Sequence, residues 1–430
     1  MKAQDIRPVV DYRLSNGIRV VFVPMDGANT TTVSVIVNNG HHHDPKGSEG
    51  IAHFVEHAVY KGTERFTIDK FNKEVALRGI TSNAYTSDKY VNHYMTGVNC
   101  EMPWMIEALS EITLHPTFPE AEIEKERNVV LDEITYRKDN HGIRVYDNAM
   151  TIVGCDTAYA RPGIGYAKAV AKMTAADLAK FNRSRYNPKN LTIVVAGGFH
   201  ISQCAKEISY YFETKAPKSS ERAFKYREHV ITSPRSELVE VVPGINSSWV
   251  QYAWKIRGFD EYAKYCCSQS DKSDYRLTCL TSLYEQIILH GASSKLHDIR
   301  EKEGICYSIG GWIDLHRDTG FLYAGGSSRH ENLEKLTKMI QSAILTANDK
   351  VFTKTTIENA ARGVTNDLIK CGDSSAKVAR YYAHGVGEGA SLAPFRDVID
   401  GCKYSFSQSD FDFITDSLRA EPVVCVLTNE

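Results

Sequence analysis

Two histidines on one turn of a predicted helix are the feature that most constrains how this sequence can fold. The stretch His53-Phe54-Val55-Glu56-His57 places two imidazoles four residues apart. They share one helix face because each residue advances about 100°. Glu56 falls within the same arc, so the stretch is typical of a hydrolytic zinc site with an acid beside the metal. On these five residues alone, a polar helix face with paired charges is an equal alternative.

A second predicted helix, over residues 120–134, offers the third ligand that a catalytic zinc site needs. It is acidic at its start, follows a proline and contains no internal Gly or Pro. Glu126 and Glu133 lie seven residues apart beside an apolar stripe, where a bare buried carboxylate is costly. We expect Glu133 to bind the metal and Glu126 to orient a histidine. A solvated face with local salt bridges is the alternative, and it is stronger for Glu126.

The motif at 53–57, followed by Glu126 and Glu133 at this separation, resembles the pitrilysin family of zinc peptidases. That family includes insulin-degrading enzyme, the mitochondrial processing peptidase and small bacterial processing proteases. By resemblance, His53, His57 and Glu133 bind one Zn²⁺ per chain and Glu56 is the catalytic base. The resemblance covers nearly the whole chain. It implies an α+β fold of two homologous domains, each a mostly antiparallel β-sheet packed with helices, which form half of a clam-like chamber.

A further segment resembles the family's substrate strand. Gly79 and Asn83-Ala84-Tyr85-Thr86 match an edge strand that lies beside the zinc in the family. An exposed edge offers unpaired backbone groups to which an extended peptide can add as a strand. The resemblance therefore implies that Asn83, Ala84 and Tyr85 bind substrate. An ordinary core strand is the alternative.

The second half of the sequence repeats the first in outline. We predict a zinc-binding catalytic domain over 1–213, a basic, proline-containing linker over 214–236, and a homologous domain without a zinc site over 237–430. Arg300 and Tyr307, seven apart around a glycine, resemble the family's C-terminal signature, whose arginine and tyrosine contact the substrate carbonyl. Fixed donors of this kind stabilise a tetrahedral oxyanion. An exposed salt-bridged arginine and a core tyrosine are the alternative.

The resemblance also implies an assembly, because a small two-domain chain of this family needs a partner chain to complete its chamber. One chain carries both motifs here, so a homodimer with two equivalent sites is the simplest assembly. The expected function is peptide processing: hydrolysis of short or unfolded peptides bound as an added β-strand inside the dimeric chamber. One alternative is the catalytic half of a heterodimer, with Arg300 and Tyr307 as relics. The other is a non-catalytic scaffold, against which the complete ligand set argues.

The composition indicates which classes of partner and which cellular compartment to expect. With 42% hydrophobic and 24% charged residues and a net charge of -2, the 430-residue chain gives no case for nucleic acid or an anionic membrane as partner. No apolar run approaches the roughly 20 residues of a membrane span. The first residues do not resemble a signal or transit peptide, although a mature chain without its presequence would look the same. The ten cysteines form no Cys-x-x-Cys pair, which favours reduced thiols in a cytoplasm or another reducing compartment.

Three consecutive histidines, His41, His42 and His43, stand outside this scheme. They lie in a predicted loop before the zinc helix, and consecutive side chains diverge. We therefore predict that they are not metal ligands.

Overall fold

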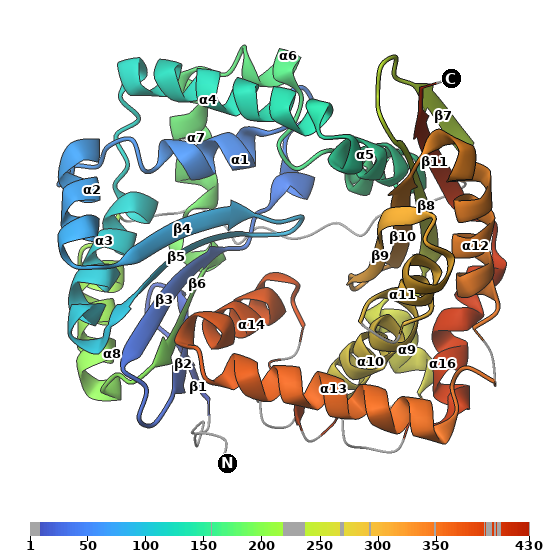
Figure 1. Cartoon of the computed structure of the whole chain (residues 1–430). Helices are drawn as coiled ribbons and strands as arrows, with labels where there is room; N and C mark the ends of the chain where they lie inside the picture. The colour runs from blue at the N-terminus through green and yellow to red at the C-terminus, as the bar shows by residue number, and fades with distance from the viewer. Residues whose placement is uncertain are drawn as a thin grey trace. The chain divides into compact units, whose positions relative to one another are not determined.

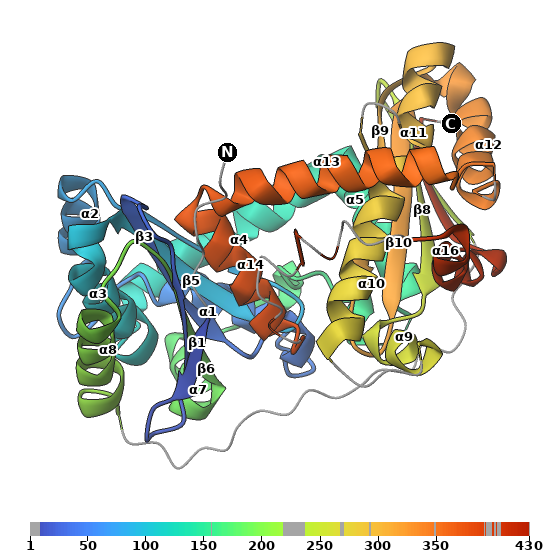
Figure 2. The same cartoon turned by 90° about the horizontal axis from the view of Figure 1, so that it is seen from below.

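A computed structural model describes residues 9–155, 157–217, 237–266, 271–291, 294–347, 350–390, 392, 398–399, 401 and 406–429. The chain forms two compact units, each with its own β-sheet (Figures 1 and 2). Unit 1 contains the described residues of the spans 1–135, 161–227 and 369–395. Unit 2 contains those of the spans 136–160, 228–368 and 396–430. No helix in the described part of the chain combines the length and the apolar character that crossing a membrane requires.

Unit 1 is built on a six-stranded sheet with the order β1-β2-β6-β3-β5-β4. Its strands are β1 Val10–Arg13, β2 Arg19–Pro24, β3 Thr30–Val37, β4 Thr81–Thr86, β5 Val91–Val98 and β6 Leu191–Gly197. Only the pairing of β2 with β6 is parallel. The five residues between β1 and β2 include Gly17 at φ 100°, a left-handed conformation that favours glycine. Strand β4 is at the edge of the sheet.

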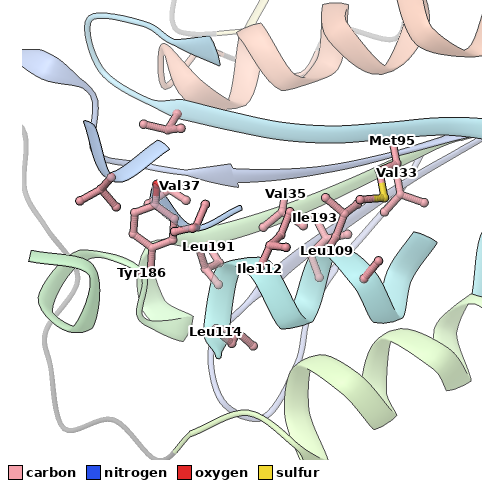
Figure 3. Packing of buried hydrophobic residues seen from close by; sticks show 14 of the residues in the cluster. Val33, Val35, Val37, Met95, Leu109, Ile112, Leu114, Tyr186, Leu191 and Ile193 are labelled. Carbon is pink, nitrogen blue, oxygen red and sulfur yellow. The ribbon is translucent and has the colours of Figure 1, made fainter. Parts of the chain in front are cut away.

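Successive side chains of β3 point to opposite faces of this sheet, and helices cover both faces. Its valines Val33, Val35 and Val37 are buried in a core with α3 (Met102–Leu114), where Leu109 and Ile112 face the strands (Figure 3). On the other face, Thr32 Oγ1 lies 3.0 Å from Ser375 Oγ of α14 (Ser375–Gly387). The remaining helices of this unit are α1 Ile51–Ala58, α2 Ile68–Leu77, α4 Glu120–Asp139, whose last residues pass into unit 2, α6 Ala167–Val170, α7 Ala175–Arg185 and α8 Ile201–Ser209.

Unit 2 repeats the strand order of unit 1. Its strands are β7 Glu237–Val241, β8 Ser248–Ile256, β9 Cys306–Leu315, β10 Gly320–Ser328 and β11 Val423–Thr428. Their order β7-β11-β8-β10-β9, with only β7 and β11 parallel, matches β2-β6-β3-β5-β4. Gly79 at φ 62° and Gly304 at φ 63° stand before the edge strands β4 and β9. The predicted α+β fold of two similar, mostly antiparallel halves is confirmed.

Each sheet is covered in part by a helix from the other half of the sequence. Helix α5 (His141–Val153) packs on β8 and β11, where Val145 and Ala149 join a core with Ala253 and Cys425. Helix α14 packs on β3 and β6, which hold the same places in the other sheet. Helix α5, from the predicted domain 1–213, therefore belongs to unit 2, and α14, from the predicted domain 237–430, belongs to unit 1. This is an exchange of one helix between the two halves of the sequence. Residues 218–236 of the predicted linker lie outside the described residues, and the domain boundaries stay a prediction.

The other helices of unit 2 follow the same α+β pattern. They are α9 Phe259–Tyr265, α10 Asp271–Tyr284, α11 Lys295–Asp298, α12 Leu333–Leu345, α13 Lys354–Gly372, whose end passes into unit 1, and α16 Gln408–Thr415.

Candidate metal centre

Helix α1 is fixed at its N-terminus by a glycine and by the carboxylate of Asp44, six residues earlier. Gly50 has φ 99°, and a Cβ there would lie 2.5 Å from the carbonyl oxygen of Ile164, so only glycine fits. Asp44 accepts hydrogen bonds from the backbone N–H groups of Gly50 (2.6 Å) and Ala52 (3.1 Å). These donors have no partner inside the helix, and the carboxylate satisfies them. Burial nevertheless raises the pKa of Asp44 to about 7.

The three predicted zinc ligands converge. Phe54, Val55 and Ala58 anchor α1 in the core, while His53 and His57 stay partly exposed on its other side. Glu133 Oε2, from α4, lies 3.8 Å from His53 Nε2 and 3.7 Å from His57 Nε2. Ligand atoms at about 2.1 Å from a tetrahedral Zn²⁺ are about 3.4 Å apart. The spacing of these atoms therefore fits a single ion, with two imidazole nitrogens and one carboxylate as donors.

Glu126 interacts with the ring nitrogen of His57 that faces away from Glu133. Its Oε1 lies 2.9 Å from His57 Nδ1, and its Oε2 lies 2.6 Å from Lys61 Nζ. Partial burial raises the pKa of Glu126, but the hydrogen bonds with His57 and Lys61 outweigh it and hold that pKa below its usual value. An ionised carboxylate accepts the proton of Nδ1, so the lone pair of a neutral imidazole is left on Nε2, which faces Glu133. The donor set thus fits Zn²⁺.

Glu56 is placed beside the ligands and is held by strand β4. Its carboxylate is buried, and Oε2 accepts a hydrogen bond of 2.7 Å from the hydroxyl of Thr86. Burial raises the pKa of Glu56 above its ordinary value, and the bond from Thr86 offsets part of this rise. A carboxyl group with a raised pKa holds a proton more readily than an ordinary carboxylate, as a group that takes and returns a proton must.

Strand β5, next to β4, contains a buried histidine. His93 of β5 has its Nδ1 3.2 Å from the hydroxyl of Tyr60 and its Nε2 3.2 Å from that of Tyr186. Burial lowers the pKa of His93 to about 3. A neutral imidazole donates at one ring nitrogen and accepts at the other, so the two tyrosine hydroxyls can satisfy both positions.

The predicted substrate strand is an edge strand. Within the described part of the chain, β4 pairs only with β5, and Asn83, Ala84 and Tyr85 are exposed or partly exposed. Strand β4 also contacts α1, which carries the histidines. An edge that adjoins the metal helix can accept an extended peptide as a further strand.

Arg300 and Tyr307 lie in unit 2. Arg300 belongs to the turn Ile299–Glu303, is half-exposed, and has Nε 3.7 Å from Glu301 Oε1. Tyr307, on β9, is 87% exposed and so is not the core tyrosine of the alternative interpretation, whereas the exposed Arg300 beside Glu301 fits both interpretations. Both side chains are accessible to a ligand or a partner.

Sequence reasoning missed three residues that support the site. Lys61 lies one helical turn after His57, a spacing that could have suggested a shared partner, and Thr86 ends the predicted substrate strand. Asp44 reaches the helix start from six residues before Gly50, outside the usual position of a capping residue.

Two family models together match most of the chain. The model of insulinase (peptidase family M16) matches residues 19–163, and that of the peptidase M16 inactive domain matches residues 172–364. The chain belongs to peptidase family M16. Across the described residues of this M16 chain, both clusters of three possible metal ligands lie before residue 134, outside the span that matches the inactive domain.

Relatives and solved structures extend over most of the M16 chain. It is 27% identical over 362 residues to an uncharacterized zinc protease of Rickettsia bellii, covering 83% of this chain and 82% of that protein. It is 23% identical over 368 residues to the uncharacterized zinc protease YmxG of Bacillus subtilis, with 83% of each covered. A protease from Helicobacter pylori superposes with a TM-score of 0.82 at 20% identity, over 98% of this chain and all of that one. A structure described as a peptidase M16 inactive domain, from Pseudomonas fluorescens, has a TM-score of 0.84 at 16% identity, over 99% and 98%. These structural likenesses show the fold.

Proposed function

We propose that this M16 chain is a zinc peptidase that hydrolyses peptide bonds in short or unfolded peptides. The observation that carries the proposal is the convergence of His53, His57 and Glu133 within 4.8 Å of one another. The hydrogen bond that His57 Nδ1–H donates to Glu126, which selects the ligating tautomer of His57, supports it further. The zinc-protease names of the relatives point the same way.

The chemistry divides among residues of unit 1. Zn²⁺ held by His53, His57 and Glu133 would polarise the substrate carbonyl and lower the pKa of a bound water towards about 7. Glu56 accepts the proton of the attacking water and returns it to the leaving amine, a task that its raised pKa suits. Thr86 fixes the position of that carboxylate.

The substrate is proposed to bind as a strand on β4, along Asn83, Ala84 and Tyr85. Backbone pairing at a sheet edge is indifferent to sequence, so such a site accepts many extended peptides. Arg300 and Tyr307 are proposed to donate to the substrate oxyanion, and their exposure supports this role. One chain carries both sets of residues, so we propose a homodimer in which each site uses residues of both chains. A closed dimeric chamber selects peptides by size.

Glu56→Gln tests the chemistry. The variant keeps the metal ligands, so zinc content measured by mass spectrometry should equal that of the wild type. Cleavage of an unfolded peptide should fall by about 10²–10⁴-fold because the proton acceptor is lost. Zinc without cleavage in both proteins would favour the scaffold. Full activity in Glu56→Gln would refute the role of Glu56.

Mixing variants tests the assembly. Glu56→Gln and Arg300→Ala chains are each expected to be inactive, and mixed dimers should regain one intact site. Sedimentation of the single purified chain should show a dimer. An inactive monomer would favour the catalytic half of a heterodimer instead.

A further inference from the structure

A second cluster of metal-ligand type joins the loop before α1 to the connection between β4 and β5. His41, His42 and Asp88 bring three ligand atoms within 4.8 Å of one another, and they share no residue with the cluster of His53, His57 and Glu133. His41 Nε2 lies 2.8 Å from Asp88 Oδ1, and His42 Nε2 lies 3.6 Å from Asp88 Oδ2. Two imidazoles thus reach the two oxygens of one carboxylate.

The backbone holds this arrangement in place. Residues His41–His43 form a 3₁₀ turn, and the N–H groups of His41 and His42 donate to the carbonyl oxygens of Ser87 (3.1 Å) and Asp88 (2.9 Å). The turn is therefore tied to the segment that carries Asp88. Consecutive side chains do diverge, but the carboxylate lies where the first two imidazoles can both meet it. The sequence-based prediction did not take Asp88 into account.

The surroundings of the cluster resemble a built site rather than a surface contact. Both histidines are buried, whereas the side chain of Asp88 is 33% exposed, which leaves a route for an ion. The rings of His41 and His42 pack edge to face with centroids 4.7 Å apart. A Cβ at Gly163 would lie 3.1 Å from Cδ2 of His41, so the glycine allows the chain to pass close to the ring.

We propose that His41, His42 and Asp88 bind a second divalent transition-metal ion, of which Zn²⁺ is the representative. Imidazole nitrogens with one carboxylate select Zn²⁺ and its neighbours over Mg²⁺ and Ca²⁺, which prefer oxygen ligands alone. The ion takes the place of the proton between His41 Nε2 and Asp88 Oδ1. A neutral imidazole then carries its proton on Nδ1, and binding releases a proton only from an imidazolium. The chain then binds two ions rather than one.

The position of the second ion gives it a stabilising role. Asp88 follows Thr86, which holds Glu56, by two residues, and His43 is followed by Asp44, which caps α1. An ion at this cluster therefore joins the end of the substrate strand to the segment that starts the zinc helix. Bound only by the folded chain, it stabilises the fold by mass action.

Metal content in a chain without the first site tests the proposal. His53→Ala/His57→Ala removes two ligands of that site, and after stripping and equilibration at about 10 µM free Zn²⁺ this chain should retain one ion. Adding His42→Ala should remove it, with the Kd for Zn²⁺ weakened by about 100-fold or more. The matched control is His43→Ala in the same background, because His43 neighbours the cluster without belonging to it; this chain should keep its ion.

A gentler variant guards against loss of folding. Asp88→Asn keeps an acceptor for His41 but removes the charge, and should weaken Zn²⁺ binding by about tenfold or more. Circular dichroism should show the same fold, and Zn²⁺ should raise Tm in the His53→Ala/His57→Ala chain but not after His42→Ala. The proposal is overturned if the His53→Ala/His57→Ala chain binds no Zn²⁺, or if that chain still binds Zn²⁺ after His42→Ala is added. A hydrogen-bonded His41–Asp88 pair without metal would then explain the cluster.

Discussion

Replacing Glu126 should weaken zinc binding in a graded way without removing a ligand. The Glu126 carboxylate is 11% exposed and lies 2.9 Å from His57 Nδ1, so the bond is little screened by solvent. A hydrogen bond to a charged group contributes about 1.5–3 kcal/mol. Each 1.4 kcal/mol is about a factor of ten in Kd. Glu126→Gln retains a neutral acceptor and should cost about tenfold, whereas Glu126→Ala frees the tautomer of His57 and should cost about 100-fold.

The assay is competition for Zn²⁺ between the purified chain and a chromophoric chelator. Glu122→Gln on the same helix is the matched control, because Glu122 pairs with the exposed Lys125 at 2.7 Å and should leave Kd unchanged. At saturating Zn²⁺ the peptidase rate of Glu126→Gln should fall less than its affinity. The reasoning would be refuted if both Glu126 variants bound Zn²⁺ within about twofold of the wild type.

Three further results are expected from the buried groups around the site. The pKa of His93 is lowered to about 3 in the folded chain, so the unfolded chain takes up a proton first as pH falls below about 6.5. The free energy of unfolding should therefore drop by up to about 1.4 kcal/mol per pH unit towards pH 3. Chemical denaturation of His93→Gln should show a shallower dependence of that free energy on pH. Gly50→Ala should lower the free energy of unfolding by more than about 2 kcal/mol, since a Cβ meets a backbone oxygen at 2.5 Å; an unchanged Tm would contradict this. Thr86→Val removes the hydrogen bond that lowers the pKa of Glu56, so the acid limb of the kcat/KM profile should move to higher pH. The rate below neutral pH should fall by about three- to tenfold. Identical pH profiles for the variant and the wild type would count against the role of Glu56.

The sequence predicts the parts of this protein that follow from periodicity. Helix α1 requires its histidines four apart to share a face, and α4 requires Glu126 and Glu133 to lie two turns apart. Gly17 between two strands and Gly79 after a helix both have positive φ, the conformation that glycine adopts at least cost.

The sequence does not predict contacts that depend on two distant segments meeting. Asp88 lies 47 residues after His41, so the cluster has no local signal, and Asp44 caps its helix from six residues before Gly50, a spacing that no capping pattern predicts. The exchange of α5 and α14 is invisible for the same reason: each helix has an ordinary amphipathic pattern, and nothing in that pattern names the sheet it covers.

That exchange makes the two halves of the gene product mutually dependent. A fragment ending before residue 218 would carry all three proposed zinc ligands but would lack α14, which packs on β3 and bonds Thr32. The complementary fragment would lack α5 over β8 and β11. Neither piece contains its own finished core, so we expect unit 1 to complete its packing only once α14 has been synthesised. Separately produced fragments should recover the metal centre only when they are combined.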